Sequence, residues 1–259
     1  MFKQRLISGI ILVLIAFVTL YYGGFLTFFV VGAISLIGVF ELLRVIQMEK
    51  SALGVIVYTG SVLYYLLLLL GLVLILLIAV YVFTFPKYEI SSIAISYFAL
   101  FYVTVMLSCI YRIRMLSDGA YMVVLVFLSA WGNDTLAYCT GRLIGKHKMS
   151  PILSPKKTVE GAIGGVIGAG LLGCLYGLFA KQFLSVNYNL IVVFGIVCAV
   201  GGLISIIGDL GASAIKRNYD IKDYSHLIPG HGGILDRFDS IIFTAPIIYY
   251  MLVMVVGLK

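Results

Sequence analysis

The chain has 259 residues, of which 62% are hydrophobic and only 11% are charged. A soluble domain is usually about half apolar and about a quarter charged. The composition therefore excludes a disordered chain, a disulfide-stapled secreted module and an ordinary soluble enzyme. The net charge of +7 would suit nucleic acid, anionic lipid or a phosphorylated substrate. No basic tail or basic amphipathic arm is present, so we expect no nucleic-acid partner and a solvent that is mostly lipid bilayer.

Apolar runs follow one another from the N-terminus. The first run, after the sequence MFKQR, imitates a signal peptide, but no small-residue cleavage site follows it, so we interpret it as a membrane helix. The sequence predicts an all-α, polytopic integral membrane protein with about nine transmembrane helices, at roughly 20 residues for each crossing. The predicted spans are Leu6–Tyr22, Phe25–Phe40, Leu53–Leu70, Leu72–Phe85, Ser91–Ser108, Tyr121–Cys139, Gly161–Phe179, Leu190–Gly208 and Ser240–Gly257.

The uncharged stretch from Leu53 to Phe85 could form one span or two. One straight helix would be roughly 50 Å long, well beyond the roughly 30 Å hydrocarbon core. Two short spans that turn near Gly71 also place most of the 18 lysines and arginines on one side of the membrane, which is the stronger positive-inside pattern. We therefore expect the N-terminus and the polar loops in the cytoplasm and the C-terminus outside.

Charge is uneven along the chain. Residues 1–108 have few charged side chains, and we interpret them as a transmembrane scaffold of five helices. Residues 109–259 have most of the charge, and we interpret them as a catalytic region of four helices with cytoplasm-facing polar loops at residues 140–160 and 209–239. The chemistry is therefore expected in the second half of the chain.

The first polar stretch combines one carboxylate with several cations. A carboxylate near the end of an apolar helix is costly and often functional, so Asp134 is a candidate site residue; local capping is the alternative. The sequence Ser154-Pro-Lys-Lys-Thr158 predicts a turn followed by a helix with Thr158 as its N-cap. Helix N-termini with nearby lysines suit phosphates, so Lys156 and Lys157 are candidate phosphate ligands. The positive-inside rule alone explains the preceding cations equally well.

The helix after Glu160 has a small residue at every fourth position. Such a stripe lets helix backbones approach closely in lipid. Packing inside one chain and packing between two copies in a homodimer would both use it. The stripe comprises Gly161, Gly165, Ala169, Gly173 and Gly177.

The second polar stretch follows the eighth predicted span. If that helix continues past Asp209, then Asp209, Ser213 and Lys216 lie on one face, with a carboxylate, a hydroxyl and an ammonium group at the membrane surface. The sequence Pro229-Gly-His-Gly-Gly233 cannot be helical. It predicts a tight loop in which backbone N–H groups can approach a ligand closely.

This mixture of residues favours phosphate chemistry. Asp236 and Asp239 lie one helical turn apart, and the histidines and cysteines show no metal-ligand spacing. Mg²⁺ is bound by one or two carboxylates plus substrate phosphates, and phosphoryl-type transfer needs positioning and charge neutralisation. The residues therefore predict metal-assisted phosphate chemistry on a membrane enzyme. His231 could serve as an acid or base, as a phosphate ligand or as a loop-structuring group.

Residues 131–240 closely resemble the phosphatidate cytidylyltransferases, or CDP-diacylglycerol synthases, whereas residues 1–130 resemble them mainly in hydropathy and length. The resemblance rests on two groups of residues. They are Asp134, Ala137-Tyr138, Gly141-Arg142, Gly145-Lys146 and Ser154-Pro155-Lys156-Lys157-Thr158-x-Glu160-Gly161, and then Ser213-x-Ile215-Lys216-Arg217-x4-Lys222-Asp223-x-Ser225-x2-Leu227-x-Pro229-Gly230-His231-Gly232-Gly233-Ile234-x-Asp236-Arg237-Phe238-Asp239.

The resemblance implies a reaction of CTP with phosphatidate, a membrane lipid, that gives CDP-diacylglycerol and pyrophosphate in phospholipid biosynthesis. It implies Mg²⁺ as cofactor, and a second, monovalent cation would suit the same site. It also implies a homodimer and, for so short a chain, a multi-pass protein of the bacterial cytoplasmic membrane.

The resemblance also implies roles for particular residues. The implied metal ligands are Asp209 and Asp236, with Asp239 as a further candidate. The implied catalytic set is Asp209, Asp236, Lys216, Lys222, Asp223, His231 and Arg237. The implied substrate contacts are Ser213 and Lys216 at the phosphatidate headgroup, with Arg217, Asp134, Lys156, Lys157, Gly232 and Gly233.

Three other functions compete with this one. A transporter would place charged groups in interrupted spans near the midplane, but here they gather at one face. A CTP-dependent kinase acting on a lipid alcohol would share the cations and carboxylates but should lack the long PGHGG-x2-DR run. A structural membrane protein gives no reason for the carboxylates beside the bilayer. The sequence therefore favours the cytidylyltransferase.

Overall fold

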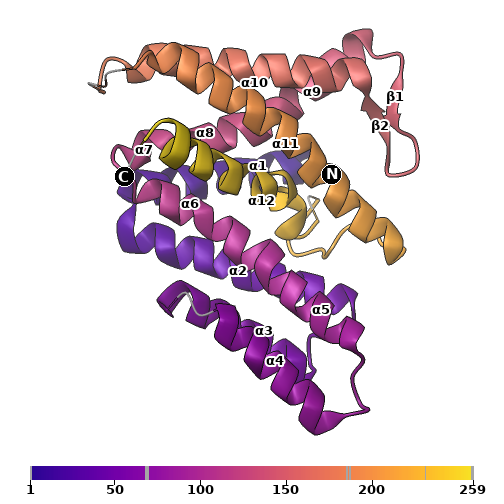
Figure 1. The fold of residues 1–259 in the computed structure, drawn as a ribbon. Helices are drawn as coiled ribbons and strands as arrows, with labels where there is room; N and C mark the ends of the chain where they lie inside the picture. Colours follow the sequence, from indigo (N-terminus) through magenta and orange to yellow (C-terminus); the bar gives the residue numbers. More distant parts are fainter. Residues whose placement is uncertain (1, 68–69, 185, 187, 231, 258–259) are drawn as a thin grey trace. The chain divides into compact units, whose positions relative to one another are not determined.

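The structure is a computed structural model that describes residues 2–67, 70–184, 186, 188–230 and 232–257. This part of the chain is mainly helical, with one short β-hairpin (Figure 1). Six of its helical segments are long and apolar enough to cross a membrane, and three shorter apolar helices accompany them. The prediction of a helical, multi-pass membrane protein is therefore confirmed, whereas the count of nine spans stays a prediction.

The helices begin and end close to the predicted spans. The first part of the chain forms α1 (Phe2–Tyr22), α2 (Gly24–Val45), α3 (Ala52–Leu67), α4 (Leu70–Thr84), α5 (Ile90–Ala99), the π-helical segment η1 (Leu100–Val105) and α6 (Met106–Arg114). The second part forms α7 (Gly119–Met122), α8 (Val124–Phe127), η2 (Leu128–Gly132), α9 (Asn133–Ile144), β1 (Lys148–Ser150), β2 (Ser154–Thr158), α10 (Val159–Ala180), α11 (Leu190–Asn218), α12 (Leu235–Tyr250) and η3 (Met251–Val255).

The stretch from Leu53 to Phe85 forms two helices, as the length argument predicts. Gly71, near which the turn was predicted, lies in the first turn of α4, and the connection between the two helices lies outside the described residues. A Cβ at Gly71 would meet no atom within 4 Å.

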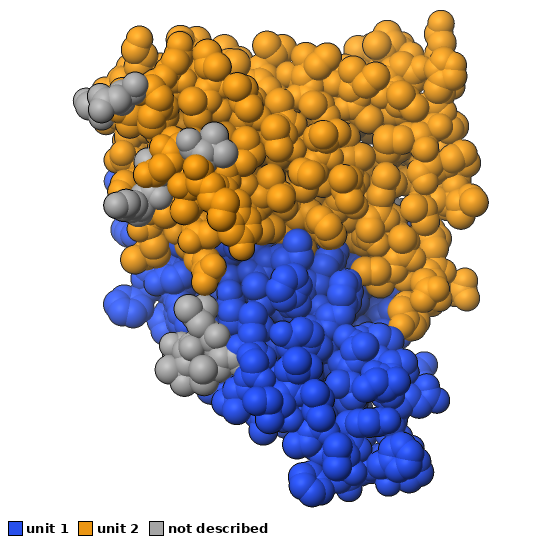
Figure 2. All heavy atoms as spheres, in the orientation of Figure 1, with its two compact units in different colours: residues 1–111, 221–237 blue, residues 112–220, 238–259 orange. Residues whose placement is uncertain are grey.

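The chain divides into two compact units, coloured separately in Figure 2. Unit 1 comprises Met1–Tyr111 and Ile221–Arg237, and unit 2 comprises Arg112–Asp220 and Phe238–Lys259. The predicted division into a scaffold and a catalytic region after residue 108 stays a prediction. The glycine-rich loop, however, belongs with the N-terminal helices of unit 1. Each unit is described below by itself.

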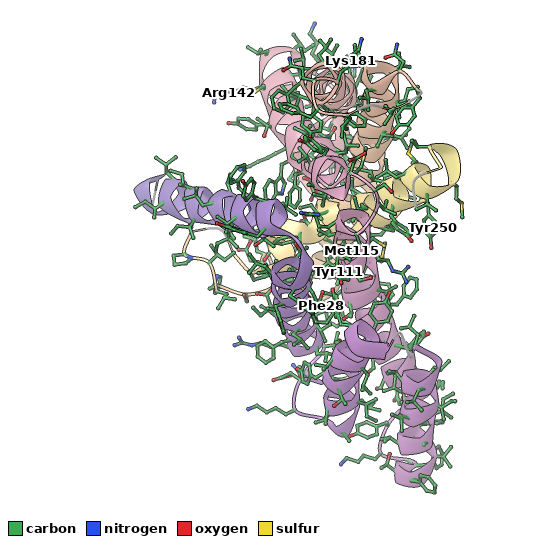
Figure 3. The ribbon with its side chains drawn as sticks, turned by 90° about the vertical axis from the view of Figure 1, so that its left-hand side faces the viewer. Phe28, Tyr111, Met115, Arg142, Lys181 and Tyr250 are labelled. Carbon is green, nitrogen blue, oxygen red and sulfur yellow. The ribbon has the colours of Figure 1, made fainter. Side chains whose placement is uncertain are left out.

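Unit 1 has an apolar core with a few buried polar contacts. Val39 and Leu43 of α2 are completely buried. Phe28 of α2 and Tyr111 of α6, labelled in Figure 3, pack edge to face with ring centroids 5.5 Å apart. Ser61 of α3 and Thr104 of η1 are buried and share a hydrogen bond of 2.8 Å. These contacts make α2 a central helix of the unit, which matters below because α2 also presents a carboxylate.

In unit 2, α10 packs between α9 and α11 along its small-residue stripe. The five predicted stripe residues are all buried, while Ile163 and Leu171 on the same helix are exposed. A Cβ at Gly165 would collide with the side chain of Asn133 on α9, and one at Gly173 with the backbone carbonyl of Phe194 on α11. The stripe is therefore used for packing inside one chain.

The segment Ser154–Thr158 differs from the prediction. It forms strand β2, which pairs antiparallel with β1 through Lys148 opposite Thr158 and Ser150 opposite Ser154. The expected turn is thus wrong, because the residues are extended and pair with a segment that the local pattern did not suggest. Pro155 is compatible with this hairpin because an edge strand tolerates a missing N–H donor. The predicted N-cap is confirmed, since Thr158 Oγ1 accepts a hydrogen bond of 3.2 Å from Gly161 N.

Candidate functional site

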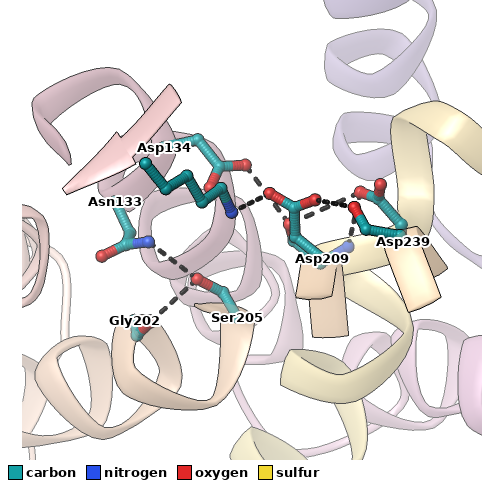
Figure 4. A network of polar contacts seen from close by, with 9 residues as sticks. Asn133, Asp134, Gly202, Ser205, Asp209 and Asp239 are labelled. Carbon is teal, nitrogen blue, oxygen red and sulfur yellow. Dashed lines mark hydrogen bonds and ion pairs between the residues drawn. The ribbon is translucent and has the colours of Figure 1, made fainter. Parts of the chain in front are cut away.

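Three acidic side chains lie in unit 2 where α9, α11 and α12 approach one another (Figure 4). Asp134 comes from α9, Asp209 from α11 and Asp239 from α12. Ser240 connects two of them, because its Oγ lies 3.3 Å from Asp134 Oδ2 and 3.5 Å from Asp239 Oδ1. The Ser240 backbone N–H also donates to Asp239 Oδ1 over 2.8 Å. Negative charge is therefore concentrated at this point of the unit.

Close helix packing brings these carboxylates together. A Cβ at Gly208 would lie 2.8 Å from the backbone oxygen of Asp239, so a larger residue would hold α11 and α12 apart. Asn133 donates a hydrogen bond of 2.9 Å to Ser205, which in turn donates to the carbonyl of Gly202 over 2.8 Å (Figure 4). Asn133 directly precedes Asp134, and Ser205 lies one helical turn before Asp209. This buried polar pair therefore fixes the register between the two acidic positions.

Lys157 supplies the countercharge. Its Nζ forms an ion pair with Asp209 Oδ2. The strand β2 places Lys157 directly before the N-cap Thr158, so the hairpin and the start of α10 together aim the lysine at α11. Both side chains are about a quarter exposed, so water and solutes can reach the pair.

Helix α11 continues past Asp209 as predicted. Its 29 residues give a length of roughly 44 Å, longer than the roughly 30 Å hydrocarbon core. Asn189 caps the first turn by accepting from Ile191 N over 3.1 Å, and cations in the last turn favour the C-terminal end of the helix. Ser213 Oγ lies 3.5 Å from Asp209 Oδ1, which confirms that these two residues share a face.

In unit 1, the glycine-rich loop is held by hydrogen bonds to the carboxylate of Asp236. Asp236 is buried, and its Oδ2 accepts hydrogen bonds from Tyr224 N at 2.8 Å and Gly233 N at 2.9 Å. Gly230 and Gly232 have φ values of 76° and 86°, a conformation that side chains other than glycine rarely adopt. The loop is therefore non-helical, as predicted, but the Gly233 N–H that we expected to face a ligand donates to Asp236.

Glu41 is a residue that the sequence reasoning missed. It lies near the end of α2, is only 1% exposed, and accepts three hydrogen bonds from the loop. The available signal was its position at the end of an apolar run, where a carboxylate is costly. That rule singled out Asp134 but was not applied to the first half of the chain. Ser205 and Ser240 were missed as well, since serine carries no such signal.

The structure brings some predicted residues together and places others elsewhere. Unit 2 groups Asp134, Lys157, Asp209, Ser213 and Asp239, whereas the predicted metal ligand Asp236 belongs to unit 1. His231 lies outside the described residues. Arg237 has a buried Nε with no hydrogen-bond partner among the residues that the structure describes. The remaining candidates are Lys156, exposed on β2; Lys216 and Arg217, in the last turn of α11; and Lys222, Asp223, Gly232 and Gly233, in the loop of unit 1.

The donor chemistry of unit 2 suits a hard cation. Within the described ranges, no group of three or more His, Cys, Asp or Glu side chains is arranged to hold a metal ion. Mg²⁺, however, needs only one or two protein carboxylates when phosphates and water complete its coordination. Asp209 and Asp239 provide such oxygens on adjoining helices. The residues present therefore fit a magnesium ion that arrives with a phosphate ligand.

Comparison with known proteins gives one family. The model of the cytidylyltransferase family matches residues 3–255. A phosphatidate cytidylyltransferase of Staphylococcus haemolyticus is 43% identical over 137 residues, which cover 53% of this chain and 51% of the relative. One of Thermotoga maritima is 40% identical over 167 residues, covering 63% and 60%. The chain thus matches about half the length of the staphylococcal relative. Because the family match extends over nearly the whole sequence, the chain belongs to the cytidylyltransferase family.

Proposed function

We propose that this protein is a phosphatidate cytidylyltransferase, which converts CTP and phosphatidate into CDP-diacylglycerol and pyrophosphate. The observation that carries the proposal is the acidic network of Asp134, Asp209 and Asp239 with its ion-paired Lys157, in a chain of this family. The names of the relatives support the substrates. The long, apolar helices support a substrate that stays in the bilayer.

The reaction needs neutralisation of negative charge more than it needs a strong base. A phosphate oxygen of phosphatidate, already anionic, forms a bond to the α-phosphorus of CTP. The bond from that phosphorus to the bridging oxygen breaks, and pyrophosphate leaves with the electron pair. Bringing two polyanions together is the main electrostatic obstacle. Lys157 and Lys216, both in unit 2, would stabilise the developing charge, with Lys156 and Arg217 beside them in sequence.

The metal requirement belongs to the same proposal. Asp209 and Asp239, both in unit 2, would hold Mg²⁺, whereas Asp236, which the resemblance implies as a ligand together with Asp209, belongs to unit 1. When bound, Mg²⁺ supplies charge neutralisation of the phosphates. Lys157 compensates Asp209 in the structure, and it would be free to turn to a phosphate when a cation takes its place.

The decisive experiment is incorporation of radiolabelled CTP into lipid by purified protein in detergent micelles. Wild type would be assayed with phosphatidate and Mg²⁺, with EDTA, and beside the variants Asp209→Asn and Asp220→Asn. Asp220 is an exposed aspartate with a φ of 52°, and asparagine tolerates that conformation, so it is a matched control. We expect Mg²⁺-dependent CDP-diacylglycerol from wild type and Asp220→Asn, and a loss of at least about 100-fold in Asp209→Asn.

The other outcomes separate the parts of the proposal. No product from folded wild type would overturn it, and labelled lipid formed from diacylglycerol and CTP labelled at the γ-phosphate would favour a lipid-alcohol kinase. Equal product from Asp209→Asn would keep the enzyme and reject Asp209 as a metal ligand. Undiminished product in EDTA would reject the metal requirement itself.

A further inference from the structure

The N-terminus of α12 is capped by a residue from a distant helix. Helix α12 begins at Leu235, and the first backbone N–H groups of a helix have no partner within it. Here Leu235 N donates to Glu41 Oε2 over 2.8 Å, and Ile234 N donates to Glu41 Oε1 over 2.9 Å. The positive end of the helix dipole also favours a carboxylate at this position. Glu41, on α2, therefore accepts the hydrogen bonds that a neighbouring N-cap residue usually accepts at the start of a helix.

The same carboxylate also holds the loop that precedes α12. Ser225 Oγ donates to Glu41 Oε1 over 2.6 Å. A Cβ at Gly233 would collide with the carboxylate group of Glu41, so this glycine lets the loop backbone lie against it. Glu41 thus contacts both ends of the segment from Ser225 to Leu235. Burying a carboxylate is costly unless hydrogen bonds compensate it, and these three bonds compensate it.

Asp236 completes the arrangement from the other side of the loop. Its Oδ2 accepts from Tyr224 N and Gly233 N, which are not the donors that Glu41 uses. The turn is closed internally by Ile228 N, which donates to Gly232 O over 2.8 Å. Two buried carboxylates therefore divide the backbone donors of the loop between them.

We propose that Glu41 is a positioning residue for the reaction: its carboxylate holds the loop of residues 224–235 in the conformation that substrate turnover requires. The loop contains Gly232 and Gly233 and leads directly into Asp236 and Arg237, all of which the resemblance implies as site residues. Glu41 itself is buried beneath the loop and acts through it. The effect on turnover rests on the proposed function, whereas the effect on the loop does not.

The substitution Glu41→Gln tests this role with almost no change in size. Glutamine replaces one acceptor oxygen by a donor NH₂ group, so in either orientation a donor faces Leu235 N or Ile234 N. Glu89→Gln is the control, because Glu89 is an exposed carboxylate that precedes a helix of the same unit. Ser225→Ala removes the hydroxyl that donates to Glu41 and accepts from Leu227 N, but it keeps the cap of α12, so it provides a milder variant.

Two measurements are made on folded protein in detergent. Amide hydrogen exchange is compared between residues 221–235 and helix α10. Steady-state kinetics give kcat and KM for CTP. For Glu41→Gln we expect loop exchange at least about tenfold faster, the scale set by losing one hydrogen bond to a charged group, with α10 unchanged. We expect kcat to fall by about tenfold or more while KM changes by less than about threefold, and Glu89→Gln to match wild type.

Each possible result supports or overturns the proposed role of Glu41. Unchanged loop exchange in Glu41→Gln would overturn the proposal, as would faster exchange with wild-type kcat. If Glu41→Gln does not yield folded protein, Ser225→Ala takes its place with the same two criteria and a smaller expected effect of about threefold. If wild type makes no CDP-diacylglycerol, the proposed function fails, while selectively faster loop exchange in Glu41→Gln would still establish the contact between Glu41 and the loop.

Discussion

In the proposed function Asp209 is the residue on which the chemistry of unit 2 depends most directly, and Lys157 is its ion-pair partner in the structure. Asp134 and Asp239 lie in the same network, so removing the lysine leaves several negative charges together with less compensation. The pair is about a quarter exposed, so water can take the place of the lysine beside Asp209, and ion pairs within reach of water contribute only about 0–1 kcal/mol to stability. We therefore expect the effect of Lys157 on function to exceed its effect on folding.

Replacing Lys157 by glutamine tests this expectation. CDP-diacylglycerol synthesis should fall by at least about tenfold, which is about 1.4 kcal/mol in the barrier, while the thermal midpoint in detergent should change by no more than a few degrees. Lys148→Gln, an exposed lysine on the neighbouring strand β1, is the control and should behave as wild type. A Lys157→Gln enzyme with full activity would remove Lys157 from the site.

Thr158 gives a prediction for stability. Its hydroxyl caps α10 through Gly161 N, and loss of such a cap costs typically about 1 kcal/mol. Thr158→Ala should lower the free energy of unfolding by about that amount, and Thr158→Ser should restore most of it. Thermal unfolding in detergent would measure both. Equal midpoints for alanine and serine would show that the methyl group, and not the hydroxyl, matters at this position.

At the scale of elements, helix α10 packs through its backbone, because small residues line the face that contacts the neighbouring helices. Gly173 lies against the carbonyl of Phe194 in α11, and a backbone atom of a packed helix cannot move aside as a flexible side chain can. Gly211 of α11 has no atom within 4 Å of the position that a Cβ would occupy. A side chain at Gly173 would therefore clash with a neighbouring helix, whereas a side chain at Gly211 would have free space.

The two glycines predict opposite responses to alanine. Gly173→Ala should destabilise the protein by about 1–3 kcal/mol through overpacking. Gly211→Ala should be neutral or stabilise it by up to about 1 kcal/mol, because alanine is the better helix former. Thermal midpoints of the two variants, measured in the same detergent, should therefore move apart. A stable Gly173→Ala protein would contradict the close approach of α10 and α11.

The sequence predicts the helices well because their signal is local. An apolar run of membrane length is itself the signal, and the cap at Thr158 and the continuation of α11 past Asp209 follow from residues close in sequence. The hairpin and the role of Glu41 were not predicted, because each depends on contacts with residues that the local sequence pattern does not identify. Strand β2 needs β1, and Glu41 needs the loop of residues 225–235. The roles of Asp209 and Asp236 in metal binding stay predictions.

At the scale of the whole molecule, the chain is a multi-pass helical membrane protein whose orientation the charge pattern predicts. Residues 140–160 should face the cytoplasm, and the segment around Lys181, between α10 and α11, should face the other side. Helix α10 fits a single crossing between them, with 22 residues and a length of roughly 33 Å.

Cysteine labelling tests this orientation. With the four native cysteines replaced, Lys181→Cys should react with a membrane-impermeant maleimide added to intact cells, and Lys156→Cys should react only after the membrane is opened. Both side chains are exposed, so access is limited by the bilayer alone. The reverse pattern would invert the proposed orientation, and equal labelling of both in intact cells would reject a crossing by α10.

Unit 1 is discontinuous, and this affects the order in which the protein can be completed in the cell. Ile234 follows Glu41 by 193 positions. At about 5–20 residues per second of synthesis, roughly 10 to 40 seconds separate the appearance of the carboxylate from that of its partners. During this interval Glu41 needs water or a temporary donor, since an unpaired buried carboxylate is costly. Glu41 can therefore acquire its final hydrogen bonds only when the ribosome has delivered the start of the last helix.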